Sequence, residues 1–511
     1  MDLHSQNKSE QNKGNLVYIF LLAYAVLIML LCAGSSPLIQ YLSPDSSIFY
    51  TMGRSAANGT VLYKEIADHK GFYLFLFNWI GAWLTPDSMN GLLLVEICFA
   101  WIKLTFVYKC AFLFTENQKR SVLVAMFFMV VATNFFSWNT GNLGEQFALA
   151  FQLISLYYMA CYVKENECAG RIAEHKPLYM FIHGVNACIV LFIQANLIAM
   201  WIPFGIGLAI ILLKERYISN FLKNLGALIG GIIVSAVPVL FYGMINHCIE
   251  DMYYVMFEIN FLYSKDGRIG ITLLSYLKGF ILQPSVGIVV MGVLGVVVAC
   301  CYYKKWYFTW TFCSMLIFSV ICMSVSMHAN PIYYTTYLPF VVPLIIWILK
   351  RVPFLSKYFY IFGAAALLLT MICNLQIVKK VFRIGTSSYA YESAEKMKDL
   401  IADKDAAVLA LANSLYYNCT GTLPHIRYFT IFGSGLRYET FPYCVDEQYN
   451  SLLSGENDYI MIQYTSDQYT FWSDEKRDEE MNYYLSREYE CIFEYREGGI
   501  HSALYKRSDV E

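Results

Sequence analysis

The chain has 511 residues, of which 57% are hydrophobic and only 15% are charged. Soluble globular proteins usually carry about 25% charged residues, so this composition argues against a soluble protein and indicates one that is integral to a membrane. The formal net charge of −2 argues against a nucleic-acid partner, which normally requires a basic surface. We therefore expect membrane lipids and no nucleic acid among the partners of this chain.

Apolar runs of roughly 20 residues, long enough to cross a bilayer as helices, recur through most of the chain. We predict about eleven transmembrane helices, near residues 16–37, 90–114, 121–138, 147–163, 178–194, 196–213, 224–245, 277–301, 306–326, 333–349 and 357–378. The first run exceeds the hydrophobic region of a typical signal peptide, and we interpret it as an uncleaved span. An odd number of spans predicts termini on opposite sides of the membrane.

The apolar segment 72–86 is not counted as a span. Its length as a helix reaches only about 22 Å, short of the roughly 30 Å hydrocarbon core, so we place it in the membrane interface. With this assignment most basic loops lie on the side of the N-terminus, which the positive-inside rule makes cytoplasmic. The sequence thus predicts a cytoplasmic N-terminus and an extracytoplasmic C-terminus, in a plasma membrane of bacterial type.

The last part of the chain changes in character, because residues 385–511 hold most of the acidic residues and no long apolar run. Strand-like stretches occur at 407–412, 459–464, 491–495 and 502–506. They alternate with polar, helix-compatible segments, which predicts a small extracytoplasmic α/β domain over residues 380–511 after a transmembrane domain of residues 1–379. Cys419 and Cys444 could pair within it, but their spacing leaves this open.

The first outer loop, residues 38–89, gathers charged residues directly after the first span. They are Asp45, Arg54, Lys64, Glu65, Asp68, His69 and Lys70. The stretch 48–58 has an apolar side and suits a short helix lying on the membrane surface. Charges at membrane edges are ordinary, so spacing alone leaves a generic solvated loop as an equal alternative.

This loop resembles the first luminal or periplasmic loop of the GT-C superfamily of glycosyltransferases, which includes protein O-mannosyltransferases, bacterial aminoarabinose transferases and lipopolysaccharide-glycosyltransferase-like families. The resemblance rests on Asp45, on NGTVLY at 58–63 and on ADHKG at 67–71. Ser46 stands where many relatives have a second acidic residue, and Phe72 stands where many have proline. The missing acidic neighbour puts a metal site in doubt, so a requirement for Mg or Mn stays open.

The resemblance implies transfer of a sugar from a polyprenyl-phosphate donor to an extracytoplasmic acceptor, with inversion at the anomeric carbon. The acceptor would be a cell-envelope glycan, a lipid or a protein. Such a displacement needs a base for the acceptor hydroxyl, and Asp45 is the candidate. Lys70 and Arg54 are the candidates for binding the donor phosphate, since cations stabilise its developing charge. Asp68 and His69 could bind a divalent ion or orient the acceptor.

Other residues near the outer membrane edge are further candidates. Glu145 follows a glycine-bearing turn at the mouth of a span, where it could orient a metal or acceptor, or only stabilise the helix that follows. His328 and Tyr333 lie at another outer turn and are weaker candidates, because an aromatic belt accounts for tyrosine there. In the loop 246–276, Asp251 and Glu258 are expected to be solvated, although this loop could also contact the donor or the acceptor.

A secondary transporter, or a flippase for lipid or polysaccharide, is the alternative function, because many membrane helices suit it equally. Transporters usually carry charged groups near the membrane midplane, and here Glu96 and Lys103 are the main case. We interpret these two residues as structural. The acidic and basic groups gather instead in one outer loop, which favours an enzyme working at the level of the lipid headgroups.

Overall fold

The computed structural model describes residues 3–167, 172–266, 272–302, 305–325, 330–352, 354–374, 382, 386–401, 403–411, 414–430, 442–465 and 475–508. By their contacts, residues fall into two compact units, each assembled from separated stretches of chain. The helical unit comprises Met1–Ala33, Leu93–Phe241 and Thr272–Leu375, and the mixed unit comprises Gly34–Leu92, Tyr242–Ile271 and Gln376–Glu511. The first outer loop therefore groups with the C-terminal residues.

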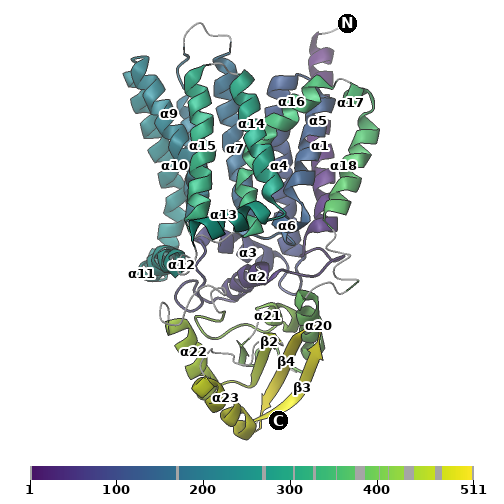
Figure 1. Cartoon of the computed structure of the whole chain (residues 1–511), viewed down its shortest axis with the longest axis vertical. Helices are drawn as coiled ribbons and strands as arrows, with labels where there is room; N and C mark the ends of the chain where they lie inside the picture. The colour runs from purple at the N-terminus through teal and green to yellow at the C-terminus, as the bar shows by residue number, and fades with distance from the viewer. Residues whose placement is uncertain are drawn as a thin grey trace. The chain divides into compact units, whose positions relative to one another are not determined.

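Long apolar helices make up the helical unit, and Figure 1 shows them running side by side. Its elements are α1 (Leu3–Cys32), α4 (Asn90–Thr115), α5 (Gln118–Ala132), α6 (Phe135–Trp138), α7 (Gly144–Glu165), α8 (Pro177–Leu191), η1 (Ala195–Met200), α9 (Trp201–Lys214), α10 (Ile218–Ile245), α13 (Leu273–Leu282), α14 (Val286–Tyr302), α15 (Trp306–Ser324), η3 (Pro331–Tyr337), α16 (Leu338–Arg351), α17 (Phe354–Lys357) and α18 (Phe359–Cys373). The first residues of α4 and the last residues of α10 belong to the mixed unit.

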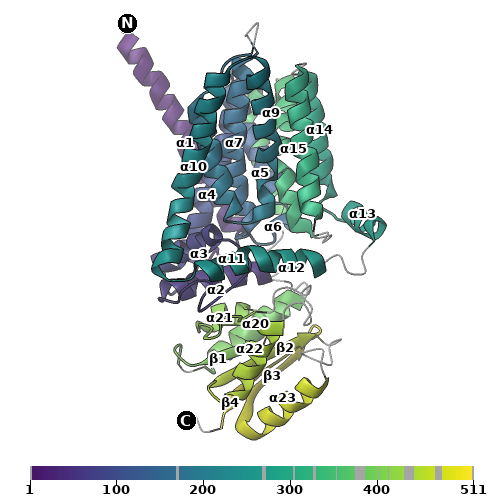
Figure 2. The same ribbon diagram turned by 90° about the vertical axis from the view of Figure 1, so that its left-hand side faces the viewer.

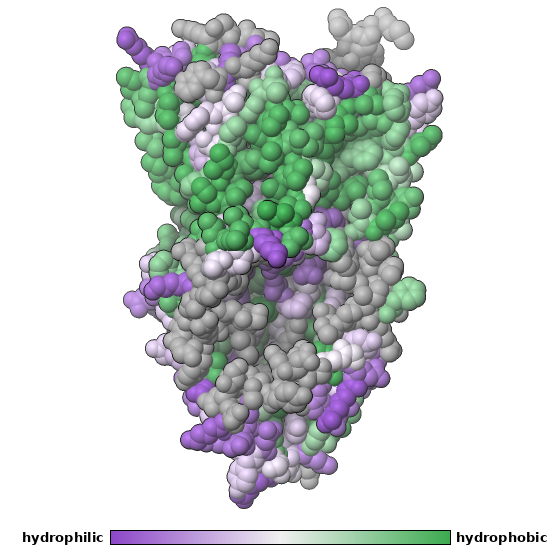
Figure 3. All heavy atoms as spheres, in the orientation of Figure 1, coloured by the Kyte–Doolittle hydropathy of each residue, from purple (hydrophilic) through white to green (hydrophobic). Residues whose placement is uncertain are grey.

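Seven of the described helical segments are long and apolar enough to cross a membrane, judged by length and composition. They are Asn15–Cys32, Asn90–Thr115, Gly144–Glu165, Ala195–Lys214, Ile218–Ile245, Tyr307–Ser324 and Pro331–Arg351. Many large apolar side chains on these helices are exposed, and Figure 3 shows them as a broad hydrophobic band. Lipid rather than water suits such a surface, so the chain is an integral membrane protein, as predicted.

Each predicted span overlaps one or two helices of the described residues, and one span is sharply bent. The span predicted at 277–301 consists of α13 and α14, whose axes differ by 89° (Figure 2). Pro284 lies in the break between them, where it can donate no backbone hydrogen bond and restricts the preceding residue. α5, α8 and α18 have 15 residues each, which is shorter than a full span. The number of about eleven crossings therefore stays a prediction.

The mixed unit contains short helices and a four-stranded sheet. Its elements are α2 (Pro44–Ala57), α3 (Phe72–Leu84), α11 (Ile249–Tyr253), the π-helical turn η2 (Tyr254–Glu258), α12 (Ile259–Asp266), α20 (Thr386–Lys398), β1 (Val408–Leu411), α21 (Leu415–Thr420), α22 (Pro442–Leu453), β2 (Tyr459–Thr465), α23 (Glu475–Glu488), β3 (Tyr489–Glu497) and β4 (Ile500–Arg507).

The sheet has the order β1-β2-β4-β3. β1 and β2 are parallel, with Leu409 opposite Ile460, and β4 pairs antiparallel with both β2 and β3. Leu409 and Ile460 on one face, and Met461 and Leu504 on the other, are fully buried, so both faces of the central strands are covered. All four predicted strands are present, which confirms a small C-terminal α/β fold.

α2 and α3 pack closely against each other, and this packing supports the loop between them. Gly53 makes the close approach feasible, because a side chain at this position would collide with the backbone of Asn78. Leu42, Tyr50 and Ala82 form a buried cluster beside this contact. The two helices thus hold the ends of the segment 58–71, in which Asp68, His69 and Lys70 lie.

Candidate functional site

Asp45 lies in the first turn of α2. The hydroxyl oxygen of Ser43 accepts a hydrogen bond from the backbone N–H of Ser46 at 3.4 Å, and Pro44 occupies the first helical turn, where its fixed φ is favourable. The helix therefore begins at Pro44, before the predicted stretch 48–58. The positive end of the helix dipole lies near the Asp45 carboxylate and favours its charged form.

Lys70 is held through its backbone immediately before α3. The Tyr63 hydroxyl donates a hydrogen bond to the Lys70 carbonyl oxygen at 3.1 Å, and the Lys70 N–H donates to Asp68 Oδ1 at 3.1 Å. Tyr63 is fully buried and has a φ of 71°, a left-handed conformation that costs a non-glycine residue about 1–3 kcal/mol. The surrounding contacts hold Tyr63 in this conformation, and Tyr63 in turn fixes the backbone of Lys70.

His69 is placed by one neighbour in the loop and by two residues of α12. Its Nδ1 lies 3.5 Å from Asp68 Oδ2, and its ring stacks on Tyr263 with centroids 5.7 Å apart. The His69 carbonyl oxygen accepts a hydrogen bond from Asn260 Nδ2 at 2.6 Å. Sequence reasoning missed Asn260 and Tyr263, because only long-range contact with the first loop distinguishes them from other polar loop residues.

The structure brings together four of the predicted site residues: Asp45, Asp68, His69 and Lys70. The pKa of Asp45 is raised, mainly because the carboxyl group is buried. The charge of Lys70 and, less strongly, that of His69 lower this pKa, whereas the charge of Asp68 raises it. The pKa of Asp68 is lowered, although burial alone would raise it. The charge and hydrogen bond of His69, together with the charge and backbone N–H of Lys70, stabilise the carboxylate more than burial destabilises it. Two carboxyl groups with pKa values pushed in opposite directions suit different roles in proton transfer.

Arg54 was predicted to bind the donor phosphate, but its hydrogen bonds favour a structural role. The guanidinium donates to the backbone carbonyl oxygens of Tyr417 at 2.8 Å and Gly421 at 2.6 Å. It also contacts the Thr422 carbonyl oxygen and Asn418 Oδ1, each at 3.4 Å. These donors satisfy part-buried acceptors at the end of α21, so Arg54 links α2 to the C-terminal part of the mixed unit.

Replacing Arg54 with alanine is therefore expected to destabilise the protein by about 1.5–3 kcal/mol, because carbonyl groups would lose a charged donor. Thermal unfolding of purified Arg54→Ala in detergent measures this effect. Lys64→Ala removes an exposed cation from the same loop and should unfold like the wild type. If Arg54→Ala unfolds like the wild type but binds a lipid phosphate more weakly, the result would contradict the structural role and support the phosphate-binding role predicted from the sequence.

Further contacts join the first loop to later parts of the mixed unit. The Ala67 N–H donates to the Arg427 carbonyl oxygen at 2.8 Å, and the Arg427 guanidinium lies 2.7 Å from Asp251 Oδ1. Asp251, which was expected to be solvated, keeps a side chain that is 30% exposed, but it also pairs with Arg427, a partner that no local pattern indicates. Glu258 is exposed, as expected. Cys419 and Cys444, whose pairing was left open, are both free thiols.

The remaining predicted residues belong to the helical unit or lie outside the described chain. Glu145 is in the first turn of α7 and is only 6% exposed, a position that also suits stabilisation of the helix N-terminus. Tyr333 is half-buried in η3, and its N–H donates to the Asn330 carbonyl oxygen at 3.1 Å. His328 lies outside the described residues.

The turn before Glu145 has an unusual backbone. Four successive residues, 139–142, have positive φ values, and Gly141 is the only glycine among them. Glu96 Oε1 accepts the Asn142 N–H at 2.9 Å, and Lys103 Nζ lies 3.4 Å from the Gln146 carbonyl oxygen. Glu96 and Lys103 thus support the segment leading into α7, in agreement with the structural role expected for them.

The described residues offer no group of three or more His, Cys, Asp or Glu side chains that could hold a metal ion. Asp68, which was predicted to bind a metal or to orient the acceptor, uses one carboxylate oxygen for the Lys70 N–H and has the other near His69. These residues therefore do not fit a metal site of protein ligands alone, and the Lys70 ammonium is the cation next to Asp45 and Asp68.

The sequence and the structure are both similar to known proteins. Residues 6–352 match the protein family described as "Putative competence-induced protein Ccs4 N-terminal domain". The structure is similar to ArnT from Cupriavidus metallidurans bound to undecaprenyl phosphate, with a TM-score of 0.58, 8% identity and coverage of 96% of this chain and 98% of that chain. No curated protein sequence matches this chain. The likeness to ArnT shows that the fold is that of the GT-C membrane glycosyltransferases, as the first loop predicted.

A second solved structure is similar over nearly the whole chain. It is the archaeal oligosaccharyltransferase AglB from Archaeoglobus fulgidus, in complex with an inhibitory peptide and a dolichol-phosphate. The TM-score is 0.49 at 12% identity, and the alignment covers 97% of this chain and 75% of that chain.

Proposed function

The chain belongs to the family of the competence-induced Ccs4 N-terminal domain and has the GT-C fold, and from this premise we propose that it is a glycosyltransferase. It would take a hexose or pentose from a polyprenyl-phosphate donor and transfer it to an extracytoplasmic acceptor. The observation that carries the proposal is the loop cluster, in which Asp45 has a raised pKa beside Asp68, whose pKa is lowered, and Lys70. ArnT, which shares the fold, was solved with undecaprenyl phosphate, a lipid of the proposed donor class.

In the proposed reaction, Asp45 accepts the proton of an acceptor hydroxyl as its oxygen attacks the anomeric carbon. The bond between that carbon and the phosphate oxygen breaks, and polyprenyl phosphate leaves with the bonding electrons. The Lys70 ammonium stabilises the charge that develops on the phosphate. Asp68 keeps His69 and the Lys70 backbone in place, and a single displacement of this kind inverts the configuration of the sugar.

The proposal places the first loop on the extracytoplasmic face of a bacterial plasma membrane, with the N-terminus in the cytoplasm. Nucleotide sugars are absent there, which is why a lipid-linked donor is required. A cell-envelope glycan, a lipid or a protein would be the acceptor. No step is assigned to a metal ion, and transfer measured with and without a chelator tests whether Mg or Mn is needed.

The experiment that tests the proposal uses the purified protein in vesicles containing a panel of polyprenyl-phosphate sugars. A transferase releases polyprenyl phosphate and forms a labelled product. A flippase, for which the bent α13–α14 pair is a supporting feature, moves the donor across the bilayer without breaking that bond. Translocation with an intact donor, in place of product, would therefore favour the alternative function.

The pH dependence of transfer should report the environment of Asp45. A base must be ionised, so kcat/KM should fall on the acid side, at a higher pH than for an ordinary carboxyl because the pKa of Asp45 is raised. Asp68→Asn removes a negative charge that raises this pKa, so the acid limb should move to lower pH. A rate profile of both proteins measures the shift, and a limb that stays in place or moves upward would contradict the assignment of Asp45.

A further inference from the structure

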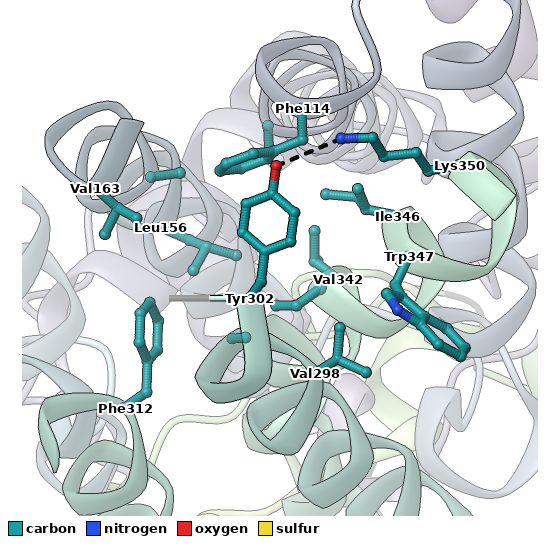
Figure 4. A pocket seen from close by; sticks show the side chains of 14 residues that line it. Phe114, Leu156, Val163, Val298, Tyr302, Phe312, Val342, Ile346, Trp347 and Lys350 are labelled. Atoms are coloured by element: carbon teal, nitrogen blue, oxygen red, sulfur yellow. Dashed lines mark hydrogen bonds between the residues drawn. The ribbon is translucent and has the colours of Figure 1, made fainter. Parts of the chain in front are cut away.

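A narrow apolar cavity of about 90 Å³ lies within the helical unit, between α4, α7, α14, α15 and α16. Figure 4 shows that aliphatic and aromatic side chains line it, among them Phe114, Leu156, Val163, Val298, Phe312 and Ile346. Tyr302 and Lys350 also line it, and their side chains point toward each other at one end. Neither the loop cluster nor the proposed transfer reaction uses this cavity.

Basic residues lie at the polar end of the cavity and beside its lining. Lys350 Nζ lies 3.5 Å from the Tyr302 hydroxyl, which donates to Glu167 Oε1 at 3.2 Å. Glu167 also forms an ion pair with Lys164 at 2.7 Å. The exposed Arg351 guanidinium lies 4.7 Å from the centroid of the Trp347 ring, which lines the cavity. Three cations therefore lie near the residues that line the cavity, and two carboxylates accompany them. Glu167 already pairs with Lys164, and the charge of Glu116 also acts on Lys164.

We propose that this cavity binds an anionic glycerophospholipid, with the end of one acyl chain among the apolar residues and the phosphate at Lys350. The apolar lining suits methylene groups, and the excess of positive charge complements a phosphate. Basic pockets between transmembrane helices on the cytoplasmic side recognise lipid headgroups in this way.

The location of the cavity also favours this lipid over the sugar donor. Lys164 and Lys350 belong to the loops and helix ends that the positive-inside rule places in the cytoplasm. The loop of Asp45 is predicted to lie on the other side. The site would therefore take a phospholipid of the cytoplasmic leaflet, and it does not depend on the proposed transferase function.

Native mass spectrometry of the full-length protein tests the headgroup contact. Phosphatidylglycerol and phosphatidylcholine are added separately, and retention is compared for wild type, Lys350→Gln and Lys357→Gln. Lys357 is an exposed cation of the same unit that does not line the cavity. Lys350→Gln should lower phosphatidylglycerol retention about fivefold, the effect of one basic residue at an anionic surface. Lys357→Gln should retain it like the wild type.

Ala160→Leu tests the acyl-chain contact without changing charge, because Ala160 lines the cavity. It should lower retention of both phospholipids. Each variant is first shown to elute as the wild type does in gel filtration. Unchanged phosphatidylglycerol retention in both Lys350→Gln and Ala160→Leu would overturn the site, and so would polyprenyl phosphate bound in preference to phosphatidylglycerol with the same dependence on Lys350.

Discussion

Replacing Asp45 with asparagine is expected to lower transfer by about 10²- to 10⁴-fold, the usual contribution of a general base. Asparagine has the same shape but cannot accept the proton of the acceptor hydroxyl. The hydrogen bond between Ser43 and Ser46 that starts α2 does not involve the Asp45 side chain, so the helix should still form. The measurement is kcat at matched protein abundance, at a pH where wild-type transfer is maximal.

Asp87→Asn is the matched control for this loss. Asp87 lies in the same first loop, its side chain is 91% exposed and it lies 3.6 Å from Lys404. Removing its charge should leave transfer within a factor of about two, because exposed ion pairs contribute little energy. Equal transfer by Asp45→Asn and wild type would show that Asp45 is not the base, whereas equal losses in both variants would point to a general effect of loop charge.

Lys70→Gln should lower kcat/KM by about 10²- to 10³-fold, as expected when a donor that stabilises transition-state charge is removed. The contacts that hold the loop at this position use the Lys70 backbone, which bonds to Tyr63 and Asp68 and is retained in the variant. The defect should therefore lie in catalysis rather than in folding. Lys70→Arg, which keeps the charge, should recover part of the lost rate.

Two comparisons make the Lys70 result interpretable. Lys64→Gln removes an exposed cation close by in the sequence and should transfer sugar like the wild type. Lys70→Gln also removes a charge that lowers the pKa of Asp45, so its acid limb should move to higher pH, opposite to the shift in Asp68→Asn. The rates are therefore compared on the alkaline plateau, and wild-type kcat/KM there would exclude Lys70 as a phosphate contact.

Local sequence patterns predicted most of the architecture. Long apolar runs indicated the positions of the helices, and short strand-like stretches between polar segments indicated β1 to β4. The apolar run 277–301 did not reveal the bend between α13 and α14, although Pro284 lies at that break. The start of α2 was also missed, although Ser43 and Pro44 form a recognisable helix-start signal.

The unpredicted parts of the site depend on contacts between distant segments. Asn260 meets His69 across 191 positions, and Arg54 meets Tyr417 across 363. No local pattern encodes such pairings, so Arg54 resembled any loop cation that could face a phosphate. Asp45, Asp68 and Lys70 could be identified because they lie close together in the sequence and match the pattern of the GT-C first loop.

The anomeric configuration of the product tests the central claim most directly. The purified protein is given a polyprenyl-phosphate sugar of known configuration, and the linkage in the product is determined by NMR. A single displacement assisted by Asp45 predicts an inverted linkage in the wild type and almost no product in Asp45→Asn. A product with retained configuration, or equal product from both proteins, would contradict the account.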